Sequence, residues 1–212
     1  MSEAGAARSG VSGVLLAAGA SSRFAGRRPK QLAPFAGEPL VRRAARTALA
    51  SRLRELIAVV GFAPAMVREA LAGLVLRVVE NPDFRDGQAS SLRTGLAAID
   101  PAARAVLILP CDQPLLTAAD LDRLITAHES AHAWIVLPRA SRRRGAPTLF
   151  DRSLFGDLAR LEGDAGGRQL FERLADRILE VELPDPRSLE DVDTAEDLIR
   201  LEAVTRARLP QT

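Results

Sequence analysis

The chain has 212 residues, of which 47% are hydrophobic and 26% charged, so it can bury a core and is not a disordered chain. Its formal net charge of +2 and its aromatic content of only 4% argue against a surface that stacks on nucleic-acid bases. No apolar run approaches the ~20 residues of a membrane span, and the single cysteine, Cys111, excludes an internal disulfide and favours a reducing, cytoplasmic location.

Short apolar runs predict strands at 11–19, 55–61, 74–81, 104–112, 133–139 and 178–184. These runs show little polar alternation, which is typical of strands buried on both faces. Segments with helical spacing alternate with them, at 38–53, 63–74, 89–99, 117–131 (with Thr117 as the expected N-cap) and 194–208. The alternation predicts an α/β fold with a mostly parallel sheet flanked by helices. We expect residues 1–10 to be a flexible tail and residues 11–212 to form one domain.

The loop after the first predicted strand, "AAGASSRFAGRRPK", is the first candidate site, because ligands of open parallel sheets bind at the carboxyl ends of the strands. Its small residues let backbone N–H groups approach an anion, and two serines add hydroxyl donors. Arg23 and Lys30 add positive charge, and Lys30 is the only lysine in the chain. The loop matches neither the Walker motif nor the dinucleotide-binding turn. An ordinary glycine-containing turn is the alternative.

The second candidate site is "LPCDQP", in which an apolar strand ends and Asp112 follows between two prolines. A carboxylate facing a phosphate-binding loop suits a magnesium–nucleotide site, although a simple loop cap is possible. Cys111 lacks a plausible histidine partner, so we interpret it as a packed thiol rather than a nucleophile. The basic segment "SRRRG" (141–145) is either a solvated turn or a phosphate-binding loop.

Five segments occur in order: "LLAAGASSRFAG…PKQL", "NPDFRDGQASSLRTGL", "LPCDQPLL", "RRGAPTLF…LEGDAGGRQL" and "EDVDTAEDL". Together they resemble the MobA-like nucleotidyltransferases, and most closely the molybdenum cofactor cytidylyltransferases, over about residues 13–200. This resemblance implies a Rossmann-like fold, which agrees with the strand and helix pattern.

The resemblance also implies roles for single residues. The nucleotide would be held by Ala17, Ala18, Gly19, Ser21, Ser22, Arg23, Lys30, Gly87 and Ser91, with Lys30, Arg23 and Asp112 as the catalytic group. Asp112 and Asp191 would bind Mg²⁺, although Asp191 or Asp193 could instead cap the closing helix. The acceptor would meet Asp164, Gly166 and Arg168.

The implied reaction is transfer of CMP from CTP to the terminal phosphate of molybdopterin, with release of pyrophosphate. Relatives that resemble guanylyltransferases carry a glycine where this chain has Ala18, so the extra methyl group favours cytosine over a purine. Relatives often have a histidine where this chain has Ala146, which leaves the acceptor open. A transient contact with a molybdoenzyme or its chaperone is a further implied partnership.

Two other classes of function remain as alternatives. "HESAH" (128–132) matches the HExxH motif of zinc hydrolases, but the chain has no third histidine, and exposed polar positions at a helix end explain the match better. A non-catalytic carrier of the molybdenum cofactor could keep the same pocket, as could a transferase for another nucleotide or another phosphorylated acceptor. Asp112 and Lys30 favour an enzyme, since a carrier needs neither a metal nor phosphate activation.

Overall fold

The central strand of the sheet is β1 (Val11–Ala17), whose seven residues are nearly all buried. The computed structural model describes residues 8–20, 29–164 and 166–206. In it, β1 pairs in parallel with β4 (Glu55–Val60) on one side and with β6 (Ala105–Pro110) on the other. Beyond β4 lies β5 (Arg77–Glu80), also parallel. Because these four strands run the same way, the residues that follow β1 and β6 come together at one edge.

On the other side of β6, the next strand of the sheet runs in the opposite direction and the two strands beyond it run again as β6 does. There β9 (Thr148–Asp151) pairs antiparallel with both β6 and β7 (Ile135–Ala140), and β10 (Ile178–Glu182) pairs in parallel with β7. The order is β10-β7-β9-β6-β1-β4-β5, with β8 (Arg143–Arg144) as a short hairpin partner of β7. The sheet is therefore mixed but mostly parallel.

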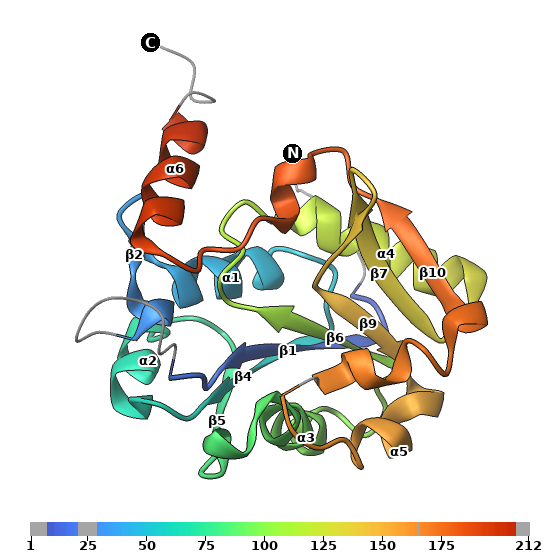
Figure 1. Ribbon diagram of the computed structural model, residues 1–212. Coiled ribbons are helices and arrows are strands. Elements are labelled where there is room, and N and C mark those ends of the chain that lie inside the picture. Colours follow the sequence, from blue (N-terminus) through green and yellow to red (C-terminus); the bar gives the residue numbers. More distant parts are fainter. Residues whose placement is uncertain (1–7, 21–28, 165, 207–212) are drawn as a thin grey trace, which may run out of the picture.

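Helices cover both faces of the sheet (Figure 1). One face is covered by α1 (Leu40–Leu49), α2 (Pro64–Ala70) and α4 (Ala118–Ala131), and the other by α3 (Gln88–Ala98) and α5 (Phe155–Leu158). Thr117 caps α4 as predicted, since its hydroxyl accepts from the Asp120 N–H while the Asp120 carboxylate accepts from the Thr117 N–H. Between β2 (Pro34–Phe35) and α1 lies the short strand β3 (Glu38–Pro39).

The closing helix α6 (Ala195–Arg206) projects from the body of the protein (Figure 1). Six short 3-10 helices complete the described structure: η1 (Lys30–Leu32), η2 (Phe84–Asp86), η3 (Arg152–Leu154), η4 (Gly166–Leu170), η5 (Ala175–Arg177) and η6 (Pro186–Leu189). In the described part of the chain, every helix is too short or too polar to cross a membrane.

The six predicted strands and five predicted helices are all present, with ends that differ by a few residues, and the predicted Rossmann-like α/β class is confirmed. The reversed strand β9 was not predicted, because four residues give too short a pattern to identify. Packing also starts earlier than expected. Ser9, placed in the predicted tail, is buried, and its N–H donates to the Arg52 carbonyl.

Candidate active site

A cavity of about 540 Å³ opens where β1 and β6 end. Residues 16–20, which include the end of β1, form one wall, and residues after β6 form another. Gln31, which is buried, fixes this turn by donating from Nε2 to the carbonyls of Ala17 and Gly19. Among the described residues, nothing lies within 4 Å of where a Gly19 side chain would start, so this part of the structure leaves its backbone open to an anion. We refer to this space as the nucleotide-side cavity, after the ligand that the sequence predicts for it.

Lys30 lies at the inner end of this cavity and bridges two carboxylates. Its Nζ is 2.7 Å from Asp112 Oδ2 and 2.8 Å from Asp193 Oδ1. The Lys30 side chain is only 11% exposed, whereas that of Asp193 is 61% exposed. Burial alone would lower the pKa of Lys30, but the two carboxylates offset this effect and raise the pKa above its ordinary value. The ammonium group is thus fixed in its charged form beside the end of β6.

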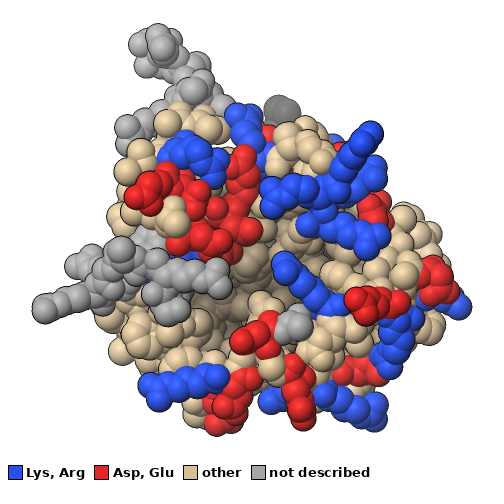
Figure 2. Space-filling view, viewed as in Figure 1, with Lys and Arg blue, Asp and Glu red and all other residues tan. Residues whose placement is uncertain are grey.

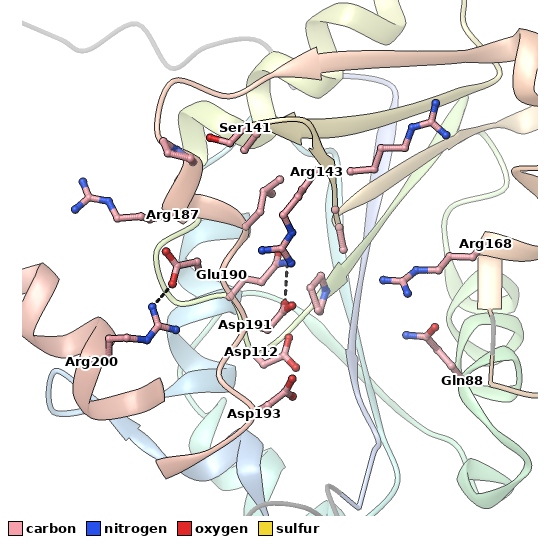
Figure 3. A pocket seen from close by; sticks show the side chains of 18 residues that line it. Gln88, Asp112, Ser141, Arg143, Arg168, Arg187, Glu190, Asp191, Asp193 and Arg200 are labelled. Atoms are coloured by element: carbon pink, nitrogen blue, oxygen red, sulfur yellow. Dashed lines mark hydrogen bonds and ion pairs between the residues drawn. The ribbon is translucent and has the colours of Figure 1, made fainter. Parts of the chain in front are cut away.

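Asp191 lies close to this bridge and is held differently. Its Oδ1 accepts from Gln113 Nε2 at 3.0 Å. Burial, followed by the negative charge of Asp112, raises the pKa of Asp191. Asp112, Asp191 and Asp193 therefore form a cluster of like charges, and Figure 3 shows the three side chains one below another along one wall.

A second cavity, of about 670 Å³, adjoins the first and shares Gln88, Pro110 and Asp112 with it. We refer to it as the acceptor-side cavity, after the second reactant that the sequence predicts. Figure 2 shows a hollow with acidic side chains gathered on one side and basic side chains on the other. In Figure 3, Arg168 and Gln88 lie across the cavity from the three aspartates. The basic residues that line it are Arg143, Arg144, Arg168, Arg187 and Arg200.

Three of these arginines already have acidic partners: Arg144 pairs with Glu180 at 2.5 Å, Arg187 with Asp185 at 3.0 Å, and Arg200 with Glu190. Arg143 and Arg168 form no ion pair within the described residues. Two guanidinium groups are therefore available to an anionic ligand opposite the aspartate cluster.

A close backbone crossing joins the start of α3 to the segment around residue 163. Gly87 has φ +95°, and a Cβ on it would lie 2.5 Å from the Gly163 carbonyl carbon. Beside it, the Ala89 N–H donates to the Gly163 carbonyl at 3.0 Å. Only glycine fits position 87 for both reasons. This crossing brings Gly87 and Asp164 into the same cavity.

The predicted site residues are distributed as follows. Ala17, Ala18, Gly19, Lys30, Gly87, Ser91 and Asp112 all line the nucleotide-side cavity, whereas Ser21, Ser22 and Arg23 lie outside the described residues. Arg168 and Asp191 line the acceptor-side cavity. Asp164, predicted on the acceptor side, lines the nucleotide-side cavity instead. Gly166 lines neither cavity and packs against the Gln88 side chain, which would lie 2.5 Å from a Cβ at that position.

Sequence reasoning missed several residues of the site. Gln31 and Gln88 lie inside the quoted motifs "PKQL" and "DGQASSL". Their place in these motifs could have identified them as candidate site residues. Arg143 belongs to the "SRRRG" segment and lines the cavity. This position favours the interpretation of the segment as a phosphate-binding loop. Neither Asp191 nor Asp193 caps α6, because Thr194 does so by accepting from the Asp197 N–H.

Two alternative chemistries find no support in the described residues. Burial raises the pKa of Cys111 to about 12, so its thiol is not a nucleophile at neutral pH. His128, expected to be exposed, is buried, and its Nε2 lies 3.0 Å from Asp151 Oδ2. No three His, Cys, Asp or Glu side chains in the described structure are grouped to hold a metal ion, which leaves the zinc-hydrolase alternative without support.

A mixed Rossmann-like sheet with a small-residue loop, a lysine and a carboxylate cluster at its carboxyl edge defines a nucleotide-binding enzyme. Comparison with known families agrees, because residues 13–178 match the model of the MobA-like NTP transferase domain. The chain belongs to this family and is a nucleotidyltransferase.

Three relatives show how far the similarity extends. Nicotine blue oxidoreductase of Paenarthrobacter nicotinovorans is 37% identical over 199 residues, which cover 90% of this chain and 96% of that protein. The crystal structure of an Rv0371c homologue from Mycobacterium sp. strain JC1 has a TM-score of 0.82 and 32% identity, covering 95% of this chain and 100% of that one. Rv0371c of Mycobacterium tuberculosis in complex with manganese has a TM-score of 0.73 and 32% identity, covering 92% and 99%.

Proposed function

We propose that the protein transfers CMP from CTP to the terminal phosphate of molybdopterin, with release of pyrophosphate. The observation that carries the proposal is the pair of adjoining cavities that share Gln88, Pro110 and Asp112. A loop of small residues suits a triphosphate in one cavity, and free guanidinium groups suit an anionic acceptor in the other. The two reactants would then meet at Asp112.

The reaction needs no covalent intermediate on the enzyme. An oxygen of the acceptor phosphate attacks the α-phosphorus of CTP, a new P–O bond forms, and the bond to the bridging oxygen breaks as pyrophosphate leaves. The chain contributes alignment and positive charge. Lys30 exchanges its carboxylate partners for phosphate oxygens, while Arg143 and Arg168 orient the acceptor. Arg23 is proposed to act on the same phosphates.

The aspartate cluster fits a divalent cation. Burial, and after it the negative charge of Asp112, raises the pKa of Asp191, and a cation between the two carboxylates would relieve their repulsion. Mg²⁺ is commonly held by one or two carboxylates plus phosphate oxygens, so two aspartates suffice. When bound, the ion would neutralise charge that develops on the phosphates. The manganese complex of the mycobacterial relative is consistent with divalent metal use in the family.

The choice of CTP rests on Ala18. Its side chain is buried at the nucleotide-side cavity, and its carbonyl accepts from the Phe62 N–H at 3.0 Å, so the methyl group cannot easily move aside for a purine. Ala146, where relatives often have histidine, lines the acceptor-side cavity, so acceptor contacts there differ from theirs. We expect the reaction to take place in the cytoplasm, with product passed to a molybdoenzyme or its chaperone.

The test measures pyrophosphate release with CTP or GTP, with and without molybdopterin, in the presence of Mg²⁺. Wild type is compared with Asp112→Asn and with the matched control Asp176→Asn, a change at an exposed carboxylate whose ion pair is with Arg177. Release that requires CTP and the pterin, and falls at least ~100-fold only in Asp112→Asn, supports the proposal. Release with GTP instead contradicts the choice of nucleotide. No release from folded protein overturns the transfer and favours a carrier or another acceptor.

A second candidate is an oxidoreductase, favoured by the relative of that name, which is 37% identical over 96% of its own length. In the described structure the chain's only cysteine has a pKa of about 12 and supplies no redox group, so the electrons would come from a bound cofactor. The direct check is whether the protein oxidises NADH or NADPH when a quinonoid dye is present as acceptor. Hydride transfer without pyrophosphate release would replace the first proposal with this one.

A further inference from the structure

A third cavity, of about 610 Å³, lies at the opposite edge of the sheet. It is lined by residues at or just before the starts of β1, β4 and β6 and by residues at the end of α4. Since the active-site cavities open at the carboxyl ends of β1 and β6, this cavity is separate from them, and it shares no lining residue with either. We refer to it as the rear cavity.

The lining of the rear cavity is basic. It contains three arginines, both histidines of the chain and one acid: Arg8, Arg54, Arg104, His128, His132 and Glu129. The acid is already neutralised, because Glu129 pairs with Arg52 at 2.8 Å. Arg54 pairs with Asp100 at 2.6 Å, and Arg8 donates from Nη1 to the Leu53 carbonyl. A negatively charged ligand is therefore favoured over a metal ion.

Arg104 is held in place by its stem rather than by an acidic partner. Its backbone N–H donates to the Gly10 carbonyl at 2.8 Å, and its side chain packs on Gly10, where a Cβ would lie 3.1 Å from Arg104 Cδ. Within the described residues, the Arg104 guanidinium forms no hydrogen bond or ion pair. Arg104 is an exposed residue, so this charge is accessible to a ligand.

His128 adds a second, independent observation. Its side chain is only 8% exposed, and its Nε2 is paired with Asp151 Oδ2 at 3.0 Å. The Asp151 carboxylate is itself fixed by the Ser153 N–H at 2.9 Å. The other ring nitrogen, Nδ1, is buried and has no hydrogen-bond partner among the described residues. Buried polar atoms are usually hydrogen-bonded, and among the described residues this nitrogen is the one buried side-chain polar atom of the rear cavity without a partner.

We infer that the rear cavity binds a small molecule that carries a phosphate group. Guanidinium groups match phosphate oxygens in geometry and charge, and an imidazole can donate to the same group. A volume of about 610 Å³ lies within the range of sites that hold small organic ligands. The "HESAH" segment, unsupported as a zinc motif, contributes His128 and His132 to this site instead.

The chain's two histidines make the site directly observable, because every imidazole signal reports on the rear cavity. Imidazole ¹H–¹⁵N spectra are recorded while inorganic phosphate is added at constant pH, with chloride at matched ionic strength as the reference. We expect saturable shifts of both histidines with phosphate but not with chloride. Arg104→Met keeps the packed stem and should raise the half-saturating phosphate concentration at least ~10-fold.

Arg123→Met is the matched control, since Arg123 is an exposed residue of the same helix α4 and does not line the cavity. It should leave phosphate binding unchanged. His132→Gln changes an exposed position. The His128 signal of this variant should still shift when phosphate is added, but the shift should be smaller. Shifts that are linear in phosphate, that are matched by chloride, or that persist unchanged in Arg104→Met would overturn the inference. None of these readouts depends on CTP, so they are separate from the proposed transfer.

Discussion

Replacing Lys30 by methionine removes the cation that holds Asp112 and Asp193 together. Breaking a fully buried ion pair by removing one partner costs about 3–5 kcal/mol, whereas an exposed pair contributes about 0–1 kcal/mol. The Asp112 side chain is 23% exposed, so the energy of the Lys30–Asp112 pair should lie between these two values. The Asp193 side chain is 61% exposed, so the energy of the Lys30–Asp193 pair should lie near the smaller value. We expect Lys30→Met to lower the free energy of unfolding by about 2–3 kcal/mol at pH 7.

Catalysis should suffer more than stability. If Lys30 stabilises charge on the phosphates in the transition state, its removal should slow pyrophosphate release by about 10²–10³-fold, which corresponds to about 2.7–4 kcal/mol. Lys30→Arg keeps the charge and should keep most of the stability. Its larger planar group cannot follow the phosphates equally well, so activity should recover only in part.

Urea unfolding and pyrophosphate release with saturating CTP and acceptor measure the two effects separately. Asp193→Asn is the matched control, because it removes the exposed half of the bridge and should cost less than about 1 kcal/mol. A Lys30→Met protein that is folded and transfers CMP at the wild-type rate would refute the catalytic role. If Lys30→Met and Asp193→Asn lose equal amounts of stability and of activity, the ion-pair bridge has only a structural role.

Three further outcomes are expected. Gly87→Ala should lower the free energy of unfolding by at least about 2 kcal/mol, measured in urea, because φ is +95° and a backbone carbonyl blocks the new methyl group. Gly19→Ala, with no described atom within 4 Å, should leave stability unchanged but weaken nucleotide binding in calorimetric titrations. Asp191→Asn should raise the free energy of unfolding at neutral pH, because the pKa of Asp191 is raised in the folded state. This gain in stability should be full above the raised pKa and should vanish as the pH falls below the ordinary value of 3.8. A gain in stability that is independent of pH would contradict this reasoning. Iodoacetamide at pH 7.5 should not modify the native protein, because a pKa of about 12 leaves fewer than about one Cys111 thiol in 10⁴ ionised, and labelling measured by mass spectrometry would disprove it.

The sequence was most informative where structure depends on local pattern. Buried parallel strands have continuous apolar runs, so β1, β4 and β6 could be predicted along with the edge at which Asp112 emerges. Strand direction has no such local signal, and four residues of β9 are too few to identify. For this reason the mixed character of the sheet was not foreseen.

Long-range partnerships were also beyond local pattern. Lys30 and Asp193 are 163 residues apart, and Gln113 and Asp191 are 78 apart, so only the fold brings them together. The prediction that His128 is exposed was wrong. A polar residue near a helix end is usually exposed, but β9 brings Asp151 next to it and makes burial of the imidazole favourable.

The division of the site between two parts of the chain has an evolutionary consequence. The nucleotide-side cavity is built from residues 16–112 together with Asp164, whereas the acceptor-side cavity, apart from four of its residues, begins at Ala140. Mutations in the second part of the chain can reshape acceptor recognition while the nucleotide loop is inherited unchanged. Under the proposed function, a gene with this layout can diversify by exchanging one reactant at a time, as long as the three shared residues, Gln88, Pro110 and Asp112, are kept.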